Sequence, residues 1–242
     1  MCYNVEAKAL ALKKYEAYFK GRKKEISGEL DLDIHLANGF LHPVLPVIVQ
    51  DEEDPVKFMH WGLVPPWCKD EKQAKELQDF TLNARAETIF EKPSFRSIVA
   101  KRCLLPITGF YEWRTFNKKK YPYYIHLKSK EPFALGCLYD EWVNRETGEI
   151  LTGFSIVTTE ANPLMAKIHN DKRRMPLILP EKAEKEWIDP GLSKEKIKQL
   201  LLPFDEALME AYTISRLITN RKENPNEPEV SLPQIYSELD PL

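Results

Sequence analysis

The apolar positions of this chain fall mostly in short runs rich in β-branched and aromatic residues, separated by turn-forming or charged stretches. Runs of this length and composition are typical of β-strands. The pattern predicts strands at residues 44–49, 56–61, 101–107, 110–114, 121–127, 132–139 and 151–158. Residues 117–120 lie between two of these runs and predict the turn of a hairpin.

Helical periodicity occurs in stretches before, between and after the strands. Amphipathic spacing predicts a surface helix over residues 7–24, near the start of the chain. Further helices are expected at residues 71–78, 163–168, 181–187, 193–202 and 203–212. Asn162 followed by Pro163 is a favourable cap and first-turn pair, so this pair sets the expected start of the third helix.

The order of these elements predicts an α+β fold. Its expected core is mainly antiparallel, curved or barrel-like, with peripheral helices, because the spacing does not suit repeated βαβ units. No linker divides the sequence, so residues 1–242 are expected to form a single domain. Residues 220–242 contain four prolines and many acidic residues, which predicts a tail with weak structure of its own.

Composition and charge narrow the function classes. The formal net charge of −2 gives no overall attraction to nucleic acid, so a DNA contact requires a local basic groove. The chain shows neither a secretion signal nor a membrane span, and we expect a cytoplasmic monomer with no membrane association. No C-x-x-C pair occurs, so the sequence predicts no zinc or other metal, no cofactor and no disulfide framework. Reduced packing residues are expected at Cys68, Cys103 and Cys137.

Cys2 directly follows the initiator methionine, and we expect removal of Met1 to expose an α-amine beside the Cys2 thiol. This pair is a 1,2-aminothiol, which captures aldehydes: the amine adds to the carbonyl carbon and the thiol closes a thiazolidine ring. Unperturbed pKa values of about 8 for the amine and about 8.5 for the thiol leave a reactive fraction near neutral pH. The alternative is that a small second residue has no chemical role.

A carboxylate stands among large aromatic residues in the segment 109–113. Strand alternation places Phe110 and Glu112 on one face, with Tyr111 and Trp113 on the other. Burial of the Glu112 face would raise the pKa of its carboxyl group and suit it to transfer protons. The alternative is an exposed face on which Glu112 pairs with Arg114.

Two further segments carry polar residues of candidate function. Asn83 can donate a hydrogen bond to a hydroxyl or aldehyde oxygen, and Arg85 can bind a phosphate through two parallel hydrogen bonds or pair structurally with Glu87. His169, expected at the end of a short helix, can exchange protons with a sugar. Phosphates can be bound by the cations that follow it, Lys172, Arg173 and Arg174. Otherwise His169 is stabilised by the helix C-terminus and the cations are solvated.

Together these motifs resemble the SOS-response-associated peptidase (SRAP) family, whose members form covalent cross-links to abasic sites in single-stranded DNA. The resemblance spans nearly the whole chain. It rests on Met1-Cys2 and on the runs at residues 61–67, 83–88, 91–96, 102–106, 109–113, 156–159, 161–164, 169 and 174–176. Each motif is weak alone, but their joint order is highly specific.

The resemblance implies a role for each matching residue. Cys2 would form the thiazolidine with the ring-opened aldehyde, Asn83 and His169 would orient and protonate the sugar, and Glu112 would act as the acid/base. Implied DNA contacts are Asn4, Trp67, Arg85, Thr159, Arg174 and Arg216. Trp67 would stack on bases, which contributes on the order of 1 to 3 kcal/mol per base. The family is also a candidate autopeptidase with lyase-like Schiff-base chemistry.

Two departures from the family pattern change these expectations. Many members have Gly-Arg after the cysteine, whereas this chain has Tyr3-Asn4, so a phosphate-binding arginine is missing. The link between His169 and Arg174 is also longer than the family often shows. We therefore expect a protein that shields abasic sites in single-stranded DNA. The alternatives are an N-terminal-nucleophile cysteine hydrolase and a non-covalent reader of single-stranded DNA damage.

Overall fold

Five strands of the larger sheet close into a barrel. In this computed structural model, which describes residues 1–15, 33–50, 55–219, 226–240 and 242, each of the five pairs with two neighbours. The ring runs in the order β10 (Ile150–Glu160), β4 (Val56–Trp61), β3 (Val44–Ile48), β6 (Arg102–Ile107) and β9 (Phe133–Val143), which pairs again with β10. Closure leaves these strands without an open edge, and only the β10–β4 ladder among them is parallel.

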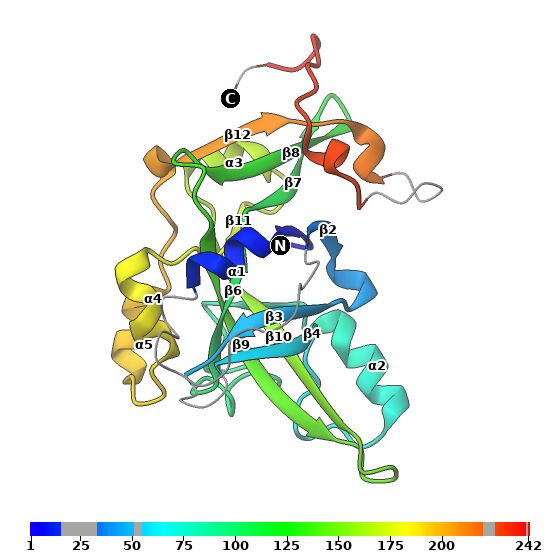
Figure 1. Ribbon diagram of the computed structural model, residues 1–242, viewed down its shortest axis with the longest axis vertical. Coiled ribbons are helices and arrows are strands. Elements are labelled where there is room, and N and C mark those ends of the chain that lie inside the picture. Colours follow the sequence, from blue (N-terminus) through cyan, green and yellow to red (C-terminus); the bar gives the residue numbers. More distant parts are fainter. Residues whose placement is uncertain (16–32, 51–54, 220–225, 241) are drawn as a thin grey trace.

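The second sheet has five strands and carries the start of the chain. Its order is β12 (Met209–Thr213), β8 (Lys119–Leu127), β7 (Gly109–Phe116), β1 (Asn4–Ala7) and β2 (Ile34–Asn38), and every neighbouring pair is antiparallel. Figure 1 places the N-terminus in the middle of the view, between this sheet and the strands of the barrel. One buried apolar cluster joins both sheets, since Val5 of β1 and Phe110 of β7 pack with Phe154 of β10.

Short strands and helices complete the fold. The far end of β10 pairs with β5 (Asn83–Arg85) and β11 (Arg174–Pro176). The helices are α1 (Ala9–Tyr15), α2 (Glu71–Phe80), α3 (Pro163–Ile168), α4 (Glu181–Ile188) and α5 (Lys194–Leu200). In Figure 1, α2, α4 and α5 lie at the edges of the molecule, and the predicted α+β fold with a barrel-like, mainly antiparallel core and peripheral helices is confirmed. Among the described residues, no helix is long and apolar enough to span a membrane.

The seven expected strands are all present, with ends shifted by at most four residues. The expected hairpin turn joins β7 to β8, and Asn117 and Lys118 adopt the positive φ angles, 48° and 62°, that a tight two-residue hairpin turn requires. The helix expected at 7–24 is observed only as α1, because Ala7 belongs to β1 and residues 16–24 lie outside the described residues.

The prediction of a helix at residues 203–212 is wrong. Residues Glu206–Leu208 form one 3-10 turn, and the chain then enters β12, which pairs with β8 along five residues. The edge of β8 offers unpaired backbone groups at this point, and sheet hydrogen bonds satisfy them better than an isolated helix would. The strands β1, β2, β5 and β11 were not expected, because these short segments contain no run of β-branched or aromatic residues.

The described part of the 220–242 segment is attached to the five-stranded sheet. It has one 3-10 turn, Pro228–Ser231, and its other contacts are made to neighbouring elements. The Asn226 side chain accepts a hydrogen bond from the Leu36 amide at 3.0 Å, and the Tyr236 hydroxyl donates to the Ile214 carbonyl at 2.9 Å. The order of this segment therefore depends on the sheet that it covers.

Gly109 allows β1 and β7 to pair at the position that sets the start of the chain. It lies opposite Glu6 of β1, and a Cβ atom at Gly109 would overlap the ring of Tyr124. The Tyr124 hydroxyl donates to the Glu6 carboxylate at 2.5 Å across this gap. Glycine is thus required here for close packing, not for an unusual backbone angle.

We expect Gly109→Ala to lower the free energy of unfolding by about 1 to 3 kcal/mol, because the added methyl group overpacks a buried site. Urea denaturation followed by circular dichroism measures the effect. In a Tyr124→Leu background the same substitution should cost less, since the overlapping ring is gone. An equal cost in both backgrounds would show that the Tyr124 ring is not the cause.

Candidate functional site

The start of the chain is fixed beside Glu112 by strand pairing and by one side chain. Asn4 pairs with Tyr111 of β7, so the residues before Asn4 continue along β7 toward Glu112. Asn83, at the start of β5, donates from its amide nitrogen to the Cys2 carbonyl oxygen at 2.9 Å. Cys2 itself is fully buried, with its sulfur 3.9 Å from the Asn4 carbonyl oxygen.

Two ionisable side chains surround the amine at the start of the chain. The Met1 nitrogen lies 3.3 Å from both ring nitrogens of His169 and 3.8 Å from Oε1 of Glu112. His169 Nδ1 is 3.9 Å from the same carboxylate oxygen. The structure therefore brings the four predicted catalytic residues together around one point: Cys2, Asn83, Glu112 and His169.

Glu112 is a buried carboxyl group. Burial raises its pKa to about 7, while the Met1 amine, the Trp113 backbone and the charges of Lys120 and Lys172 act in the opposite direction. Its Oε1 atom has no hydrogen-bond partner among the described residues. Burial also excludes the alternative of a Glu112–Arg114 pair on an exposed face, and Arg114 donates instead to the Asp240 carbonyl at 2.7 Å. A carboxyl group with a pKa near neutrality is suited to give and take protons.

His169 is held neutral and in one orientation. It ends α3, whose start is capped by Asn162 as expected, and its Nδ1 atom lies 2.9 Å from the Arg174 carbonyl oxygen. Burial lowers the His169 pKa to about 4, and the neighbouring amine of Met1 adds to the effect. A neutral ring donates its Nδ1 proton to the Arg174 carbonyl, which leaves Nε2, 3.3 Å from the Met1 nitrogen, as the proton acceptor of the ring.

Burial has opposite effects on the reactivity of the Met1 amine and of the Cys2 thiol. It lowers the pKa of the Met1 amine, which favours the neutral, nucleophilic form. It raises the pKa of the Cys2 thiol, and the Glu112 charge raises it further, so the thiolate is disfavoured. At this buried position an amine is therefore more readily activated than the neighbouring thiol.

The guanidinium group of Arg174 is occupied by protein partners. It binds the Glu87 carboxylate through two hydrogen bonds of 2.6 and 3.0 Å and donates to the Thr158 carbonyl at 2.6 Å. Arg174 is buried, so its guanidinium group is not free to bind a ligand from solvent. The sequence suggested Arg85 as a structural partner of Glu87, but the partner that the structure shows is Arg174, from a distant segment.

The other expected DNA contacts lie in varied settings. Arg85 and Trp67 are exposed, and the Trp67 indole donates to the Pro93 carbonyl at 3.2 Å. Thr159 is buried, with its hydroxyl bound to the Glu160 carbonyl. Arg216 lies over the rings of Tyr121 and Tyr236, at 4.9 and 5.3 Å from their centroids. Of this group, Arg85, Trp67 and Arg216 are exposed, whereas Thr159 is buried.

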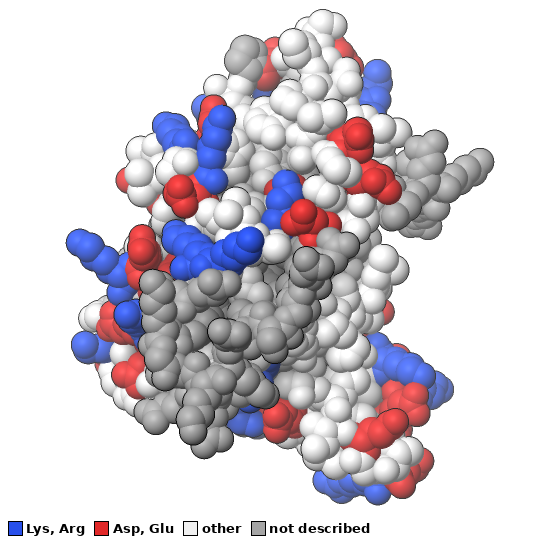
Figure 2. All heavy atoms as spheres, viewed as in Figure 1, with Lys and Arg blue, Asp and Glu red and all other residues white. Residues whose placement is uncertain are grey.

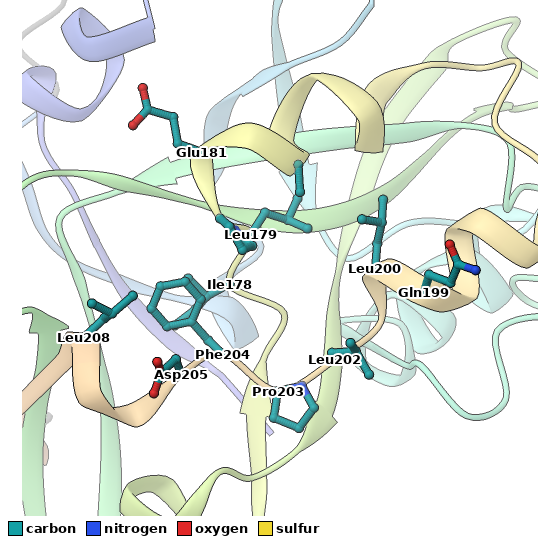
Figure 3. A pocket seen from close by; sticks show the side chains of 12 residues that line it. Ile178, Leu179, Glu181, Gln199, Leu200, Leu202, Pro203, Phe204, Asp205 and Leu208 are labelled. Carbon is teal, nitrogen blue, oxygen red and sulfur yellow. The ribbon is translucent and has the colours of Figure 1, made fainter.

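Neither the surface charges nor the cavity described here indicates a different reactive site in the described part of the chain. Figure 2 shows basic and acidic side chains in small neighbouring groups on the face that it draws. An apolar cavity of about 410 Å³ lies between α4, α5 and the connection to β12, and Figure 3 shows Leu179, Leu200 and Phe204 among its lining side chains. None of the four clustered residues lines it. All four cysteines are buried and free, and no group of metal-binding side chains occurs in the described part of the chain.

Comparisons with known proteins agree with one another. The family model of SOS response associated peptidase (SRAP) matches residues 1–221. Abasic site processing protein YoqW of Bacillus subtilis (strain 168) is 40% identical over 215 residues, which cover 84% of this chain and 92% of that protein. Abasic site processing protein HMCES of Xenopus tropicalis is 30% identical over 191 residues, 70% of this chain and 55% of that protein.

The fold comparison gives the same result. The crystal structure of a protein from Bacteroides thetaiotaomicron superposes with a TM-score of 0.88 at 39% sequence identity, covering 97% of this chain and all of the other (100%). The family model covers all four residues that surround the start of the chain. This chain belongs to the SOS response associated peptidase (SRAP) family.

Proposed function

We propose that this protein processes abasic sites in single-stranded DNA by forming a covalent, reversible thiazolidine through Cys2. The observation that carries the proposal is the convergence of Asn83, Glu112 and His169 on the first two residues of the chain. The names of the relatives, abasic site processing proteins, support the choice of substrate.

The proposed reaction requires Met1 to be removed, so that the α-amine belongs to Cys2. The amine adds to the C1 aldehyde of the ring-opened abasic sugar, and loss of one water molecule gives an imine. The Cys2 sulfur then adds to the imine carbon, and its proton passes to the nitrogen as the ring closes. No oxidant or further reactant is needed, and reversal consumes the same water molecule.

The geometry supports a role for each neighbour. Asn83 holds the Cys2 carbonyl and so orients both the amine and the thiol of that residue. His169 is neutral and lies 3.3 Å from the Met1 nitrogen, so it is placed to accept a proton from the Cys2 amine once Met1 has been removed. Glu112, with a pKa of about 7, donates a proton to the departing hydroxyl as water leaves. The raised thiol pKa favours an order in which the amine reacts first.

Recognition of a single strand rests on exposed groups. Trp67 offers an accessible ring on which a base can stack whatever its sequence. Arg85 is an exposed guanidinium on β5, two residues from Asn83, and can bind a phosphate next to the damaged sugar. A single strand suits this arrangement, since its bases are free to stack.

Cys2→Ala is expected to abolish the adduct that survives denaturing gel electrophoresis after incubation with uracil-excised single-stranded DNA. The variant loses the thiol that closes the ring but keeps an amine, so borohydride should still trap an imine. Cys68→Ala, which removes a buried thiol outside the site, is the matched control and should react like the wild type. Intact mass of the wild type checks whether Met1 is absent. A wild-type yield from Cys2→Ala would refute the thiazolidine.

Glu112→Gln is expected to slow adduct formation by roughly 100-fold or more, the usual contribution of a general acid or base. Glu112 has a raised pKa of about 7 and is protonated below that pH, so the wild-type rate should fall as pH rises through about 7. The variant should lose this falling limb. Single-turnover rates from pH 5 to 9 measure it, and binding to DNA with a stable tetrahydrofuran analogue controls for lost affinity. An unchanged falling limb in the variant would remove Glu112 from the mechanism.

A further inference from the structure

The loop that follows His169 is fastened to the β7–β8 hairpin. The Asn170 side chain accepts from the Thr115 amide at 3.0 Å and donates to the Thr115 carbonyl at 2.7 Å. The Thr115 hydroxyl also donates to Asp171 at 2.8 Å. These bonds lie on the edge of β7 that β1 pairs with at Tyr111, four residues before Thr115. The loop therefore continues the same edge just beyond the start of the chain.

The fastened loop and hairpin present exposed cations together. Lys118, Lys119 and Lys120 are exposed at the hairpin, and Lys172 and Arg173 are exposed on the loop. Lys120 approaches Asp171 at 3.9 Å, which places hairpin and loop cations on adjoining surface. Among the described residues, no ion pair involves Lys172 or Arg173, so their charges are available to an anion.

Two of these cations lie close enough to act on the reacting groups. The charges of Lys120 and Lys172 both act on Glu112, and Lys172 also acts on His169 and on the amine at the start of the chain. Arg174, in contrast, is bound to Glu87 and buried. The exposed cations nearest the site on this side are thus supplied by the hairpin and the loop.

We propose that the β7–β8 hairpin and the loop 170–173 form a phosphate clamp, in which Lys120 and Lys172 bind the DNA backbone beside the abasic nucleotide. This inference rests on the proposed function for its substrate. The occupant is a polynucleotide strand, because ammonium groups on two joined elements suit an extended row of phosphates. The clamp supplies positive charge near the chain start, where Tyr3 and Asn4 carry none.

The test measures non-covalent binding of a single-stranded oligonucleotide that carries a tetrahydrofuran abasic analogue, over a range of salt concentrations. The double variant Lys120→Gln, Lys172→Gln should bind roughly tenfold more weakly at low salt, and the slope of log K against log salt should fall by about 0.7 per lost phosphate contact. The matched control is Lys128→Gln, Lys182→Gln, which removes two exposed lysines elsewhere. Thermal unfolding verifies that both variants are folded.

The outcomes separate the clamp from the chemistry. Equal affinity and slope in the two double variants, or a wild type that does not bind the analogue, would overturn the clamp. If the wild type binds the analogue but gives no adduct with a true abasic site, the proposed reaction fails and the clamp is judged by the binding data alone. With a true abasic site, loss of the clamp should raise the half-saturating DNA concentration.

Discussion

The position of the first residues constrains the rest of the site, and one hydrogen bond together with two strand pairings fixes it. Asn83 holds the Cys2 carbonyl, and β1 is held between β2 and β7 through Asn4. A chain terminus normally frays, because little beyond it restrains the backbone. Here the terminus lies between the barrel and the second sheet, so an amine is delivered to a fixed point. The spacing of Gly109 and Tyr124 maintains that pairing, which links a packing requirement to the geometry of the reacting groups.

Burial of the terminus has a chemical consequence as well as a structural one. Low polarity favours the neutral forms of amine, imidazole and carboxyl groups, so the amine becomes a better nucleophile and Glu112 keeps a proton near pH 7. At Glu112 the folded state binds a proton more tightly than the unfolded chain between the ordinary pKa of 4.5 and about 7. By linkage, the contribution of Glu112 to stability falls as pH rises through this window, whereas the lowered pKa of His169 gives a contribution that rises with pH between about 4 and 6.5. The site therefore holds a carboxyl group at a cost to stability, as expected where function sets a pKa.

Much of the fold follows from local sequence, because long strands such as β8 and β9 contain their runs of aromatic and other apolar residues within themselves. The turn at Asn117 is equally local. The strand β12 was mistaken for helix, since its structure is imposed by the edge of β8 and not by its own residues. Among the site residues, the chemical roles of Cys2 and Glu112 can be predicted from the local sequence. Asn83 and His169 were assigned to the same site only through the family resemblance. The pairing of Glu87 with Arg174 joins segments 87 residues apart, and no local pattern predicts it.

The buried and exposed cations of this region have separable tasks. Arg174 is bound to Glu87 and Thr158, and its carbonyl sets the orientation of the His169 imidazole ring. An arginine engaged in this way would have to give up two charge-assisted hydrogen bonds before it could bind a phosphate. Lys172 has no such commitment among the described residues, and its flexible ammonium group remains hydrated. The four-residue link between His169 and Arg174 thus allows one arginine to stay in the protein framework while Lys172 remains exposed.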